Sequence, residues 1–303
     1  MGLYDIAVIG AGPAGMTAAL YAVRAGKRVL LLEGEMYGGQ IVQSRLVENY
    51  PGAPEIGGAE LAMKMMEPLS ALGVDPTYGK VTALCKAEDR FEIVTDSERY
   101  EARAVIIATG VGHRKLEVPG EDRLIGGGVS FCATCDGMFF RGREVAVVGG
   151  GNTAVQDALV LAELCSRVYL IHRRDSFRAE ARLVERMKAT ENIECITDTV
   201  VTEMQGSPKL ESLILRNVKT EETRTLPVSG VFLAVGNVAK NEAFRDLIEL
   251  DDAGFILTDA DCKTSQEGIF AAGDCRQKKV RQLTTATADG TIAALSAVEY
   301  LDA

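Results

Sequence analysis

The sequence contains little histidine and few basic residues, and each shortage excludes a class of function. Its two histidines, His113 and His172, lie far apart, which disfavours a nucleophilic triad. Lys and Arg number 33 against 43 for Asp and Glu, and the net charge of −10 disfavours nucleic acid as the main partner, because phosphate binding requires a positive surface. The seven cysteines are sparse and odd in number, unlike the dense, even set of a small secreted domain. We therefore expect a cytoplasmic protein.

A long uncharged stretch, residues 6–23, does not fit a membrane span although it is long enough for one. Gly10, Gly12, Pro13 and Gly15 interrupt it, which favours a strand followed by a helix. No Lys or Arg precedes the stretch, so the basic start of a secretion signal is missing as well. The 303 residues, of which 47% are hydrophobic, predict a globular chain of about two domains.

The same stretch has the pattern of a dinucleotide-binding motif, G-x-G-x-x-G. The sequence around it predicts a strand, a helix and a second strand in succession, at residues 5–9, 14–24 and 28–32. Gly10 would permit the tight turn, Gly12 the close approach of a pyrophosphate, and Gly15 the packing of the helix on the strand. Glu33 follows the second strand, where a carboxylate accepts hydrogen bonds from a ribose. The alternative is a glycine turn with a purely structural role.

A second motif of this kind, G-x-G-x-x-A, begins at Gly149 and ends at Ala154. The elements predicted around it are a strand, a helix and a strand, at residues 144–148, 152 to about 164, and 168–171. Two more buried strands that end in glycine, and a third near the C-terminus, are expected at residues 104–110, 231–236 and 269–273. Buried runs of this type indicate parallel sheets that are covered on both faces, as in α/β proteins.

The two motifs differ in the residue that should meet the ribose. Glu33 lies 23 residues after Gly10, and the equivalent position of the second motif is His172, followed by Arg173 and Arg174. A carboxylate there would repel a 2′-phosphate, whereas guanidinium groups bind it. The first site therefore suits FAD or NAD, and the second suits NADP(H), with Arg178 close enough in sequence to contribute.

The alternative is that Arg173 and Arg174 lie on a solvated face, where Asp175 or Glu180 could pair with them.

A C-x-x-C motif, Cys132 to Cys135, lies between the two glycine-rich motifs and indicates a dithiol/disulfide centre. Zinc is the alternative, but a structural zinc site needs four ligands, and the chain has neither a second C-x-x-C nor paired histidines. We expect no metal. Asp136 places a carboxyl group beside the thiols, where it could exchange protons, or it could simply form the turn before Gly137. The other cysteines are expected to be small buried side chains: Cys85, Cys165, Cys195, Cys262 and Cys275.

Taken together and in this order, the motifs resemble those of the low-molecular-weight thioredoxin reductase family along essentially the whole chain. The resembling segments are residues 10–15, 38–40, 48–52, 108–110, 132–137, 149–154, 172–174, 177–179, 273–274 and 281–282. The resemblance implies two Rossmann-like dinucleotide-binding domains of the three-layer ββα type, with an NADPH domain at residues 114–240 inserted into an FAD domain at residues 1–113 and 241–303. It also implies a homodimer that reduces thioredoxin, with no nucleic acid or membrane partner.

The resemblance assigns roles to individual residues as well. Cys135 would face the flavin, Cys132 would exchange with the partner disulfide, and Asp136 would be the acid. Met138 and Phe139 would present apolar side chains to thioredoxin, although core packing would also explain them. The residues implied to bind FAD are Gly10, Gly12, Pro13, Ala14, Gly15, Glu33, Gly39, Gln40, Asn49, Val81, Thr109, Gly110, Gly273, Asp274, Arg281, Gln282 and Leu283. Those implied to bind NADPH are Gly150, Gly151, Asn152, Thr153, His172, Arg173, Arg174, Arg178 and Gly236.

Two features depart from the family pattern. The segment Gly236 to Lys240 lacks the proline–asparagine pair usual after this glycine. His113 is also unusual just after the strand end at residues 108–110. We also expect the domains to rotate about residues 111–115 and 236–241. The reason is that Cys135 and Gly149 are only 14 residues apart, yet the disulfide and the nicotinamide both need access to one flavin.

Three other functions share parts of this pattern. A flavin disulfide reductase that serves a peroxidase-type partner usually carries an extra N-terminal redox domain, for which this chain has no room. A dithiol oxidase linked to oxygen would lack the arginine-rich phosphate site. A nucleotide-sensing module would bind flavin but would not reduce disulfides with NADPH.

Overall fold

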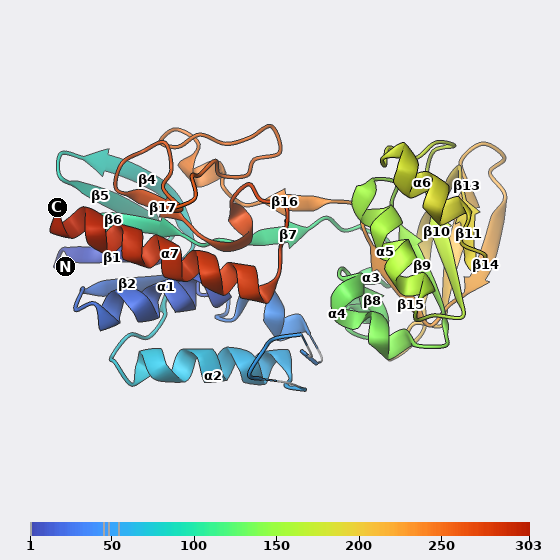
Figure 1. Cartoon of the computed structure of the whole chain (residues 1–303), viewed down its shortest axis with the longest axis horizontal. Helices are drawn as coiled ribbons and strands as arrows, with labels where there is room; N and C mark the ends of the chain where they lie inside the picture. Colours follow the sequence, from blue (N-terminus) through green and yellow to red (C-terminus); the bar gives the residue numbers. More distant parts are fainter. Residues whose placement is uncertain (1, 45, 48, 54) are drawn as a thin grey trace. The chain divides into compact units, whose positions relative to one another are not determined.

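The chain forms two compact units, which are described here one at a time. The computed structural model describes residues 2–44, 46–47, 49–53 and 55–303. The first unit comprises Met1–Gly112 and Val238–Ala303, and the second comprises the residues between them, 113–237 (Figure 1). The second unit is therefore an insertion in the first. The expected domain limits, after residues 113 and 240, lie one and three residues from these divisions.

The sheet of the first unit is parallel at its centre and antiparallel at one side. The strand order is β3-β2-β1-β6-β5-β4, and β17 pairs with β6 as well. β6 is long enough to pair with β5 along its first half and with β17 along its second half. The strands are β1 (Tyr4–Ile9), β2 (Val29–Glu33), β3 (Thr77–Tyr78), β4 (Val81–Ala87), β5 (Arg90–Thr95), β6 (Arg99–Ile107) and β17 (Ile269–Ala271).

Three helices cover one face of this sheet: α1 (Pro13–Arg24), α2 (Gly58–Ser70) and α7 (Leu283–Asp302). α1 and α7 lie side by side (Figure 1), and a Cβ at Gly290 of α7 would stand 2.3 Å from the carbonyl oxygen of Ala14. Small residues therefore allow the two backbones to approach closely, and they hold the start of α1 in place. On the opposite face, residues of the central strands form one buried cluster with residues of β4 and β5, the antiparallel side of the sheet, and of the short helix η3 (Glu242–Phe244). The expected division of residues 6–23 into a strand and a helix is confirmed.

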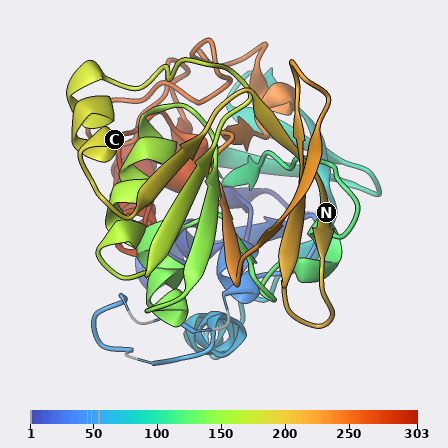
Figure 2. The ribbon, with the colours of Figure 1, turned by 90° about the vertical axis from the view of Figure 1, so that its right-hand side faces the viewer.

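The second unit has three layers (Figure 2). Its parallel sheet has the order β11-β10-β9-β15-β8. Alternate residues of each strand point to opposite faces, so that Val145 and Val147 pack against the helices, whereas Ala146 and Val148 pack against an antiparallel sheet. The elements are β8 (Val129–Ser130), β9 (Glu144–Val148), β10 (Arg167–Ile171), β11 (Ile193–Ile196) and β15 (Gly230–Leu233) in the parallel sheet, helices α5 (Asn152–Ala162) and α6 (Ala181–Lys188), and antiparallel strands β12 (Thr199–Gln205), β13 (Ser212–Asn217) and β14 (Thr223–Pro227). The expected three-layer α/β fold is confirmed, and α5 ends two residues before the expected limit.

The chain passes between the units twice, and the two crossings pair with each other. β7 (Val111–His113) and β16 (Asn237–Ala239) form a separate two-stranded sheet. Both crossings fall within the segments expected to act as hinges. The remaining short helices are η1 (Gly39–Gln43), α3 (Glu121–Leu124), α4 (Ala133–Asp136), η2 (Gly137–Phe140) and η4 (Gly273–Cys275). Within the described ranges, no helix is both long enough and apolar enough to cross a bilayer.

Candidate active site

The first glycine-rich turn lies at the carboxyl edge of the sheet in the first unit. Ile9 of β1 pairs with Ile107 of β6, and Ile107 pairs with Ala271 of β17, so these strands end at the same level. The residues that follow the strands therefore stand next to each other, which is where open parallel sheets bind ligands. This register brings Gly10, Thr109 and Gly273 together, although they are far apart in the sequence.

Glycine is required at two positions of this turn. Gly10 has φ +107°, and a Cβ there would lie 2.4 Å from the carbonyl oxygen of Ala108. A Cβ at Gly15 would lie 1.8 Å from the carbonyl oxygen of Gly10, so α1 packs on β1 only because residue 15 has no side chain. Gly12 caps α1 without a side-chain hydrogen bond, and Gly39 stands so close that its Cβ would be 3.3 Å from Gly12 Cα. The start of α1 thus offers free N–H groups and a partial positive charge to an anion.

Glu33, the expected ribose ligand, is held beside this turn. Its Oε2 accepts a hydrogen bond from the backbone N–H of Ala11 at 2.8 Å, and its Oε1 accepts one from Glu35 at 2.8 Å. Each carboxylate oxygen retains a further lone pair. The carboxylate is therefore both fixed in place and able to accept hydrogen bonds from a ribose.

The polar side chains implied to contact a flavin also lie in the first unit, and several are tied to one another. Thr109 donates to Asn241 at 3.0 Å, and Asn49 donates to Gln282 at 3.3 Å. Gln40 donates to the carbonyl oxygen of Val111. Arg281 stacks over the ring of Phe255 at 4.2 Å, Leu283 begins α7 and Val81 begins β4. The segment 48–52 is described in part, because Glu48 lies outside the described residues.

The buried carboxyl group of Asp274 shows whether a ligand with several hydroxyl groups fits the carboxyl edge of this sheet. Its Oδ1 atom is buried and has no hydrogen-bond partner, although Lys278 Nζ lies 3.6 Å away. Burial raises the pKa of its carboxyl group, and the charges of Lys278 and Arg281 oppose that effect. A buried acceptor without a donor is costly, and a hydroxyl group of a ligand would satisfy it. The residues present therefore fit a flavin dinucleotide, which carries both phosphates and a polyol chain.

Asn241 is a member of this site that the sequence did not reveal. It is 1% exposed, and its amide group donates to the carbonyl oxygens of Gly254 and Cys275 at 2.9 and 3.0 Å. Its Oδ1 accepts the hydrogen bond from Thr109. Asn241 thus holds the loop after β6 against the turn after β17, and its partners are too distant in sequence to suggest this role.

The second glycine-rich turn is built in the same way within the second unit. A Cβ at Gly149 would lie 2.5 Å from the carbonyl oxygen of Ala234. A Cβ at Gly150 would overlap the ring of His172 at 2.1–2.5 Å, so glycine at 150 is needed for this histidine to pack beneath the turn. The backbone N–H of Arg178 donates to the carbonyl oxygen of Gly150 at 2.7 Å. The loop that carries the arginines is therefore attached directly to the glycine-rich turn.

His172 itself is buried, with 5% of its surface exposed. Its Nε2 lies 3.1 Å from the carbonyl oxygen of Ser176, and its ring stacks on Phe177 at 5.4 Å. Burial, followed by the charges of the neighbouring arginines, lowers its pKa. This placement makes His172 a support for the loop.

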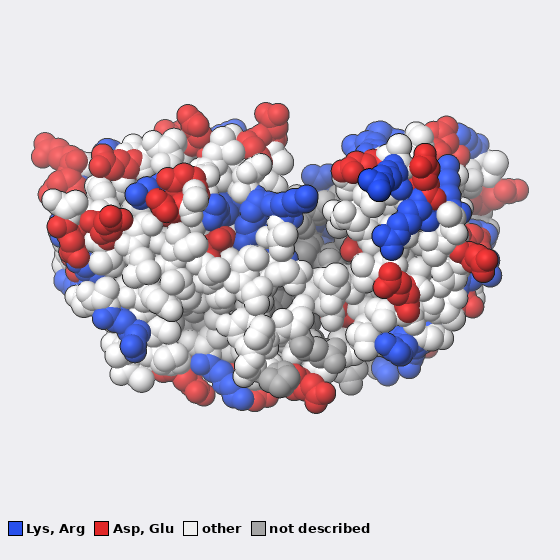
Figure 3. Space-filling model, in the orientation of Figure 1, with Lys and Arg blue, Asp and Glu red and all other residues white. Residues whose placement is uncertain are grey.

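Arg173, Arg174 and Arg178 are exposed, and none of them forms an ion pair with an acidic side chain of the described residues. These arginines therefore lie on a solvated face, as in the alternative, but the pairing with Asp175 or Glu180 that it allowed is not found among the described residues. Asp175 pairs with Lys219 at 3.3 Å, and the backbone N–H of Glu180 donates to the Asn152 side chain at 2.8 Å. Basic side chains gather over α5 and α6 on the face shown in Figure 3. The charge of the three arginines is available to a phosphate.

The other expected residues of this site lie at the ends of elements. Gly151 caps α5, Thr153 lies in the first turn of α5, and Gly236 has φ +110° with open space around it.

The redox pair also belongs to the second unit. Cys132 and Cys135 form a disulfide of 2.10 Å at the start of α4, and both residues are half-buried. Ser130, which is 6% exposed, donates to Asp136 Oδ2 at 2.6 Å and accepts from the backbone N–H of Cys132 at 3.1 Å. Burial raises the pKa of the Asp136 carboxyl group, and the bond from Ser130 lowers it. No cluster of three metal-ligating side chains is found in the described part of the chain.

The remaining cysteines and the apolar pair divide by exposure. Cys165, Cys262 and Cys275 are buried as expected, but Cys85 and Cys195 are exposed, so the expectation for these two is wrong. Cys85 lies on β4 and Cys195 on β11, and each of these strands is at the edge of its sheet, where a neighbouring strand covers one side only. Met138 and Phe139, just after the redox pair, are 48% and 37% exposed, which does not fit core packing.

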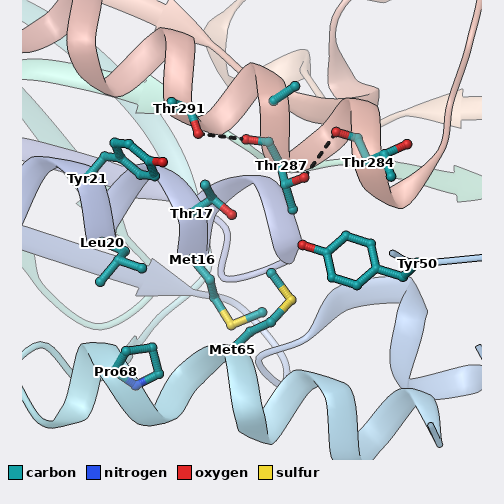
Figure 4. A pocket seen from close by; sticks show the side chains of 11 residues that line it. Met16, Thr17, Leu20, Tyr21, Tyr50, Met65, Pro68, Thr284, Thr287 and Thr291 are labelled. Carbon is teal, nitrogen blue, oxygen red and sulfur yellow. Dashed lines mark hydrogen bonds between the residues drawn. The ribbon is translucent and has the colours of Figure 1, made fainter. Parts of the chain in front are cut away.

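A separate cavity of about 430 Å³ lies among α1, α2 and α7 of the first unit (Figure 4). Met16, Tyr50 and Met65 line one side of it, and Thr287 and Thr291 of α7 line the other. None of the expected site residues contributes to its wall.

Comparison with known proteins gives one consistent result. A family model described as pyridine nucleotide-disulphide oxidoreductase matches residues 4–290. The chain is 45% identical over 300 residues to a thioredoxin reductase of Treponema pallidum (strain Nichols), which covers 99% of this chain and 97% of that protein. The solved thioredoxin reductase of Streptococcus pyogenes MGAS5005 matches with a TM-score of 0.94 at 44% identity, covering 99% of this chain and 98% of that one. That of Lactococcus lactis, in its FR conformation, matches with a TM-score of 0.70 at 45% identity and 99% coverage of both chains.

Proposed function

Since this chain belongs to the pyridine nucleotide-disulphide oxidoreductase family, and within it to the thioredoxin reductases, we propose that it is an NADPH-dependent flavoenzyme that reduces the disulfide of thioredoxin. The observation that carries this proposal is the disulfide between Cys132 and Cys135, which lies in the same unit as the second glycine-rich turn. Bound NADPH would supply a hydride, and bound FAD would pass two electrons on to a disulfide.

We assign FAD to the first unit. The start of α1 would hold the pyrophosphate, Glu33 the ribose, and Asp274 a hydroxyl group of the ribityl chain. The support for this assignment is the free helix start, the fixed carboxylate of Glu33 and the unpartnered Oδ1 of Asp274. The remaining expected flavin residues lie on the same edge or beside it.

We assign NADPH to the second unit. Gly150, Gly151 and the start of α5 would hold its pyrophosphate, and the unpaired guanidinium groups of Arg173 and Arg174 would bind its 2′-phosphate, with Arg178 beside them. The absence of a carboxylate at the position equivalent to Glu33 supports NADPH over NADH.

The two cysteines would then reduce thioredoxin by disulfide exchange. The thiolate of Cys132 attacks the thioredoxin disulfide, which forms a mixed disulfide and releases one thioredoxin thiolate. Cys135 attacks Cys132 Sγ, which re-forms the disulfide of this chain and releases the second thiolate. The two protons lost by the cysteines end on the thioredoxin thiols, and Asp136 exchanges protons with the sulfur atoms during these steps.

We further propose that thioredoxin docks on Met138 and Phe139, that the protein is a homodimer, and that the two units rotate about β7 and β16 between half-reactions. The exposure of the apolar pair beside Cys132 supports the docking site. The two solved relatives differ in TM-score, 0.94 against 0.70, at nearly equal identity, which is expected if family members adopt more than one arrangement of their units. Light scattering on the purified protein would test the dimer.

The decisive experiment is an anaerobic titration with NADPH, followed by oxidised thioredoxin. We expect NADPH to reduce the bound flavin, and the added thioredoxin to reoxidise it with the appearance of two thioredoxin thiols. NADH at the same concentration is the matched control for the assignment of the arginines. Flavin reduction without thioredoxin reduction would refute the proposal, and so would binding of NADPH without flavin reduction.

A further inference from the structure

Ser130 is the one buried hydroxyl among the described residues that contacts both the redox turn and its neighbouring carboxyl group. It lies at the end of β8, where Phe232 of β15 is its register partner, so the parallel sheet fixes its backbone. The N–H of Cys132 can only donate, so Ser130 Oγ accepts there, and its single proton is left for Asp136 Oδ2. With Asp136 ionised, and so able only to accept, the direction of both hydrogen bonds is determined.

We propose that Ser130 is a positioning residue for disulfide exchange, because its hydroxyl group connects the backbone of Cys132 to the carboxyl group of Asp136 and favours the ionised form of that group. This inference rests on the proposed function, in which Asp136 exchanges protons with the thiols. The side-chain hydrogen bonds of Ser130 within the described part of the chain go to Asp136 and to the backbone N–H of Cys132, so it acts through Asp136 and through the start of α4.

The geometry explains why this carboxyl group needs a partner. Burial disfavours its charged form, whereas a hydroxyl donor at 2.6 Å favours it. Burial therefore raises the pKa of this carboxyl group, the bond from Ser130 opposes that effect, and a group balanced in this way can give up and take back a proton. No charged side chain contributes to the pKa of Asp136, which depends on burial and on Ser130 alone. On the neighbouring elements, α5 carries Asp157 and is followed directly by Glu163, while β8, η2 and β15 carry no titratable side chain.

A second hydroxyl group in the turn provides a contrast. Thr134 Oγ1 lies 3.4 Å from Cys132 Sγ and is exposed to solvent. It makes no hydrogen bond with Asp136 among the contacts of the described residues. Removing it should therefore leave the titration of Asp136 unchanged, which makes Thr134→Val a matched control for Ser130→Ala.

The test uses the flavin-bound enzyme reduced with dithiothreitol, in which the rate of alkylation of Cys132 by iodoacetamide is measured across the pH range. In the wild type, ionisation of Asp136 produces a step in this profile. We expect Ser130→Ala to move the step upward by about one pH unit, because the lost hydrogen bond no longer stabilises the carboxylate. Ser130→Thr, which keeps the hydroxyl group, should restore the wild-type position, and Thr134→Val should not move it. In Asp136→Asn the step should disappear, and adding Ser130→Ala to that variant should create no new step in the pH profile of the alkylation rate.

A purely structural role would give another result: a lower rate at every pH with the step in its original place. That outcome in Ser130→Ala would overturn the inference, and so would a step that persists in Asp136→Asn and moves when Ser130→Ala is added. The assay needs neither NADPH nor thioredoxin. A failure of NADPH-driven thioredoxin reduction by the wild type would therefore refute the proposed function while this profile still decides the role of Ser130.

Discussion

Asp157 offers a quantitative test of the second unit, because it is a carboxyl group that the fold buries without compensation. It lies in α5, half-buried, and burial alone raises its pKa to about 7 from the ordinary 3.8. The folded protein therefore binds this proton more tightly than the unfolded chain does. Between those two pKa values, the stability of the folded state falls as the pH rises, by at most about 1.4 kcal/mol per pH unit.

The substitution Asp157→Asn removes the charge and keeps the shape. At pH 8 the wild-type carboxylate is ionised in both states and carries the full cost of burial, which the amide avoids. Above pH 5 the wild type loses stability over about two pH units, up to the pKa of about 7. Between pH 5 and pH 8, the free energy of unfolding of the Asn variant should therefore gain about 1–3 kcal/mol on that of the wild type. The lower figure allows for solvent near a half-buried group. For a unit of this size that corresponds to a gain in Tm of about 4–12 °C.

Scanning calorimetry of the flavin-bound enzyme without NADPH, at pH 5, 6, 7 and 8, measures this gain. Glu163→Gln is the control, because Glu163 lies just beyond the end of the same helix with 74% of its side chain exposed. Its effect on Tm should be small and independent of pH. A gain for Asp157→Asn that stays constant with pH, or shrinks as the pH rises, would show that burial does not control this carboxyl group.

Three further predictions concern the proposed reaction. Replacing Arg173 and Arg174 with Ala should raise KM for NADPH about tenfold or more, while KM for NADH changes little, because each lost charge-assisted contact with the 2′-phosphate is worth about 1.5–3 kcal/mol; steady-state kinetics with both nucleotides checks this, and equal effects would contradict the assignment. Cys135→Ser should leave a flavin that NADPH still reduces, as followed by absorbance, but should abolish thioredoxin reduction; any remaining reduction would exclude Cys135 from the exchange. A crosslink that fixes the two units should preserve one half-reaction in rapid kinetics and abolish turnover, so full turnover of the crosslinked enzyme would disprove the rotation.

What the sequence predicts well are constraints that act over a few residues. The clash that excludes a side chain at Gly15 involves Gly10, five positions away, and it is therefore written into the spacing of the motif. The disulfide joins Cys132 and Cys135, which are three positions apart, and their spacing in the sequence predicts it as well. Patterns of this kind also predict the fold class, because the succession of a buried strand, a glycine turn and a helix occurs twice along the chain.

What the sequence could not predict depends on contacts between distant positions. Thr109 and Asn241 are 132 residues apart, and nothing in either neighbourhood indicates that they meet. Asp175 pairs with Lys219, 44 residues away, whereas the sequence indicates only the neighbouring arginines as its partners. Cys85 and Cys195 are exposed on the edge strands β4 and β11, and residue type does not determine which strand forms the edge of a sheet.

The two departures from the family pattern, which had no explanation separately, meet in the structure. His113 Nδ1 lies 3.1 Å from the side-chain oxygen of Asn237, a residue of the unusual segment 236–240. The His113 ring also stacks on Phe131 at 4.4 Å with only 6° between the planes, and Phe131 directly precedes Cys132. A histidine supplies both a flat ring for the stack and an N–H for the amide, whereas a plain aromatic residue would supply only the ring. His113 of β7 and Asn237 of β16 thus contact each other, and the ring of His113 packs on the segment that leads into the redox turn.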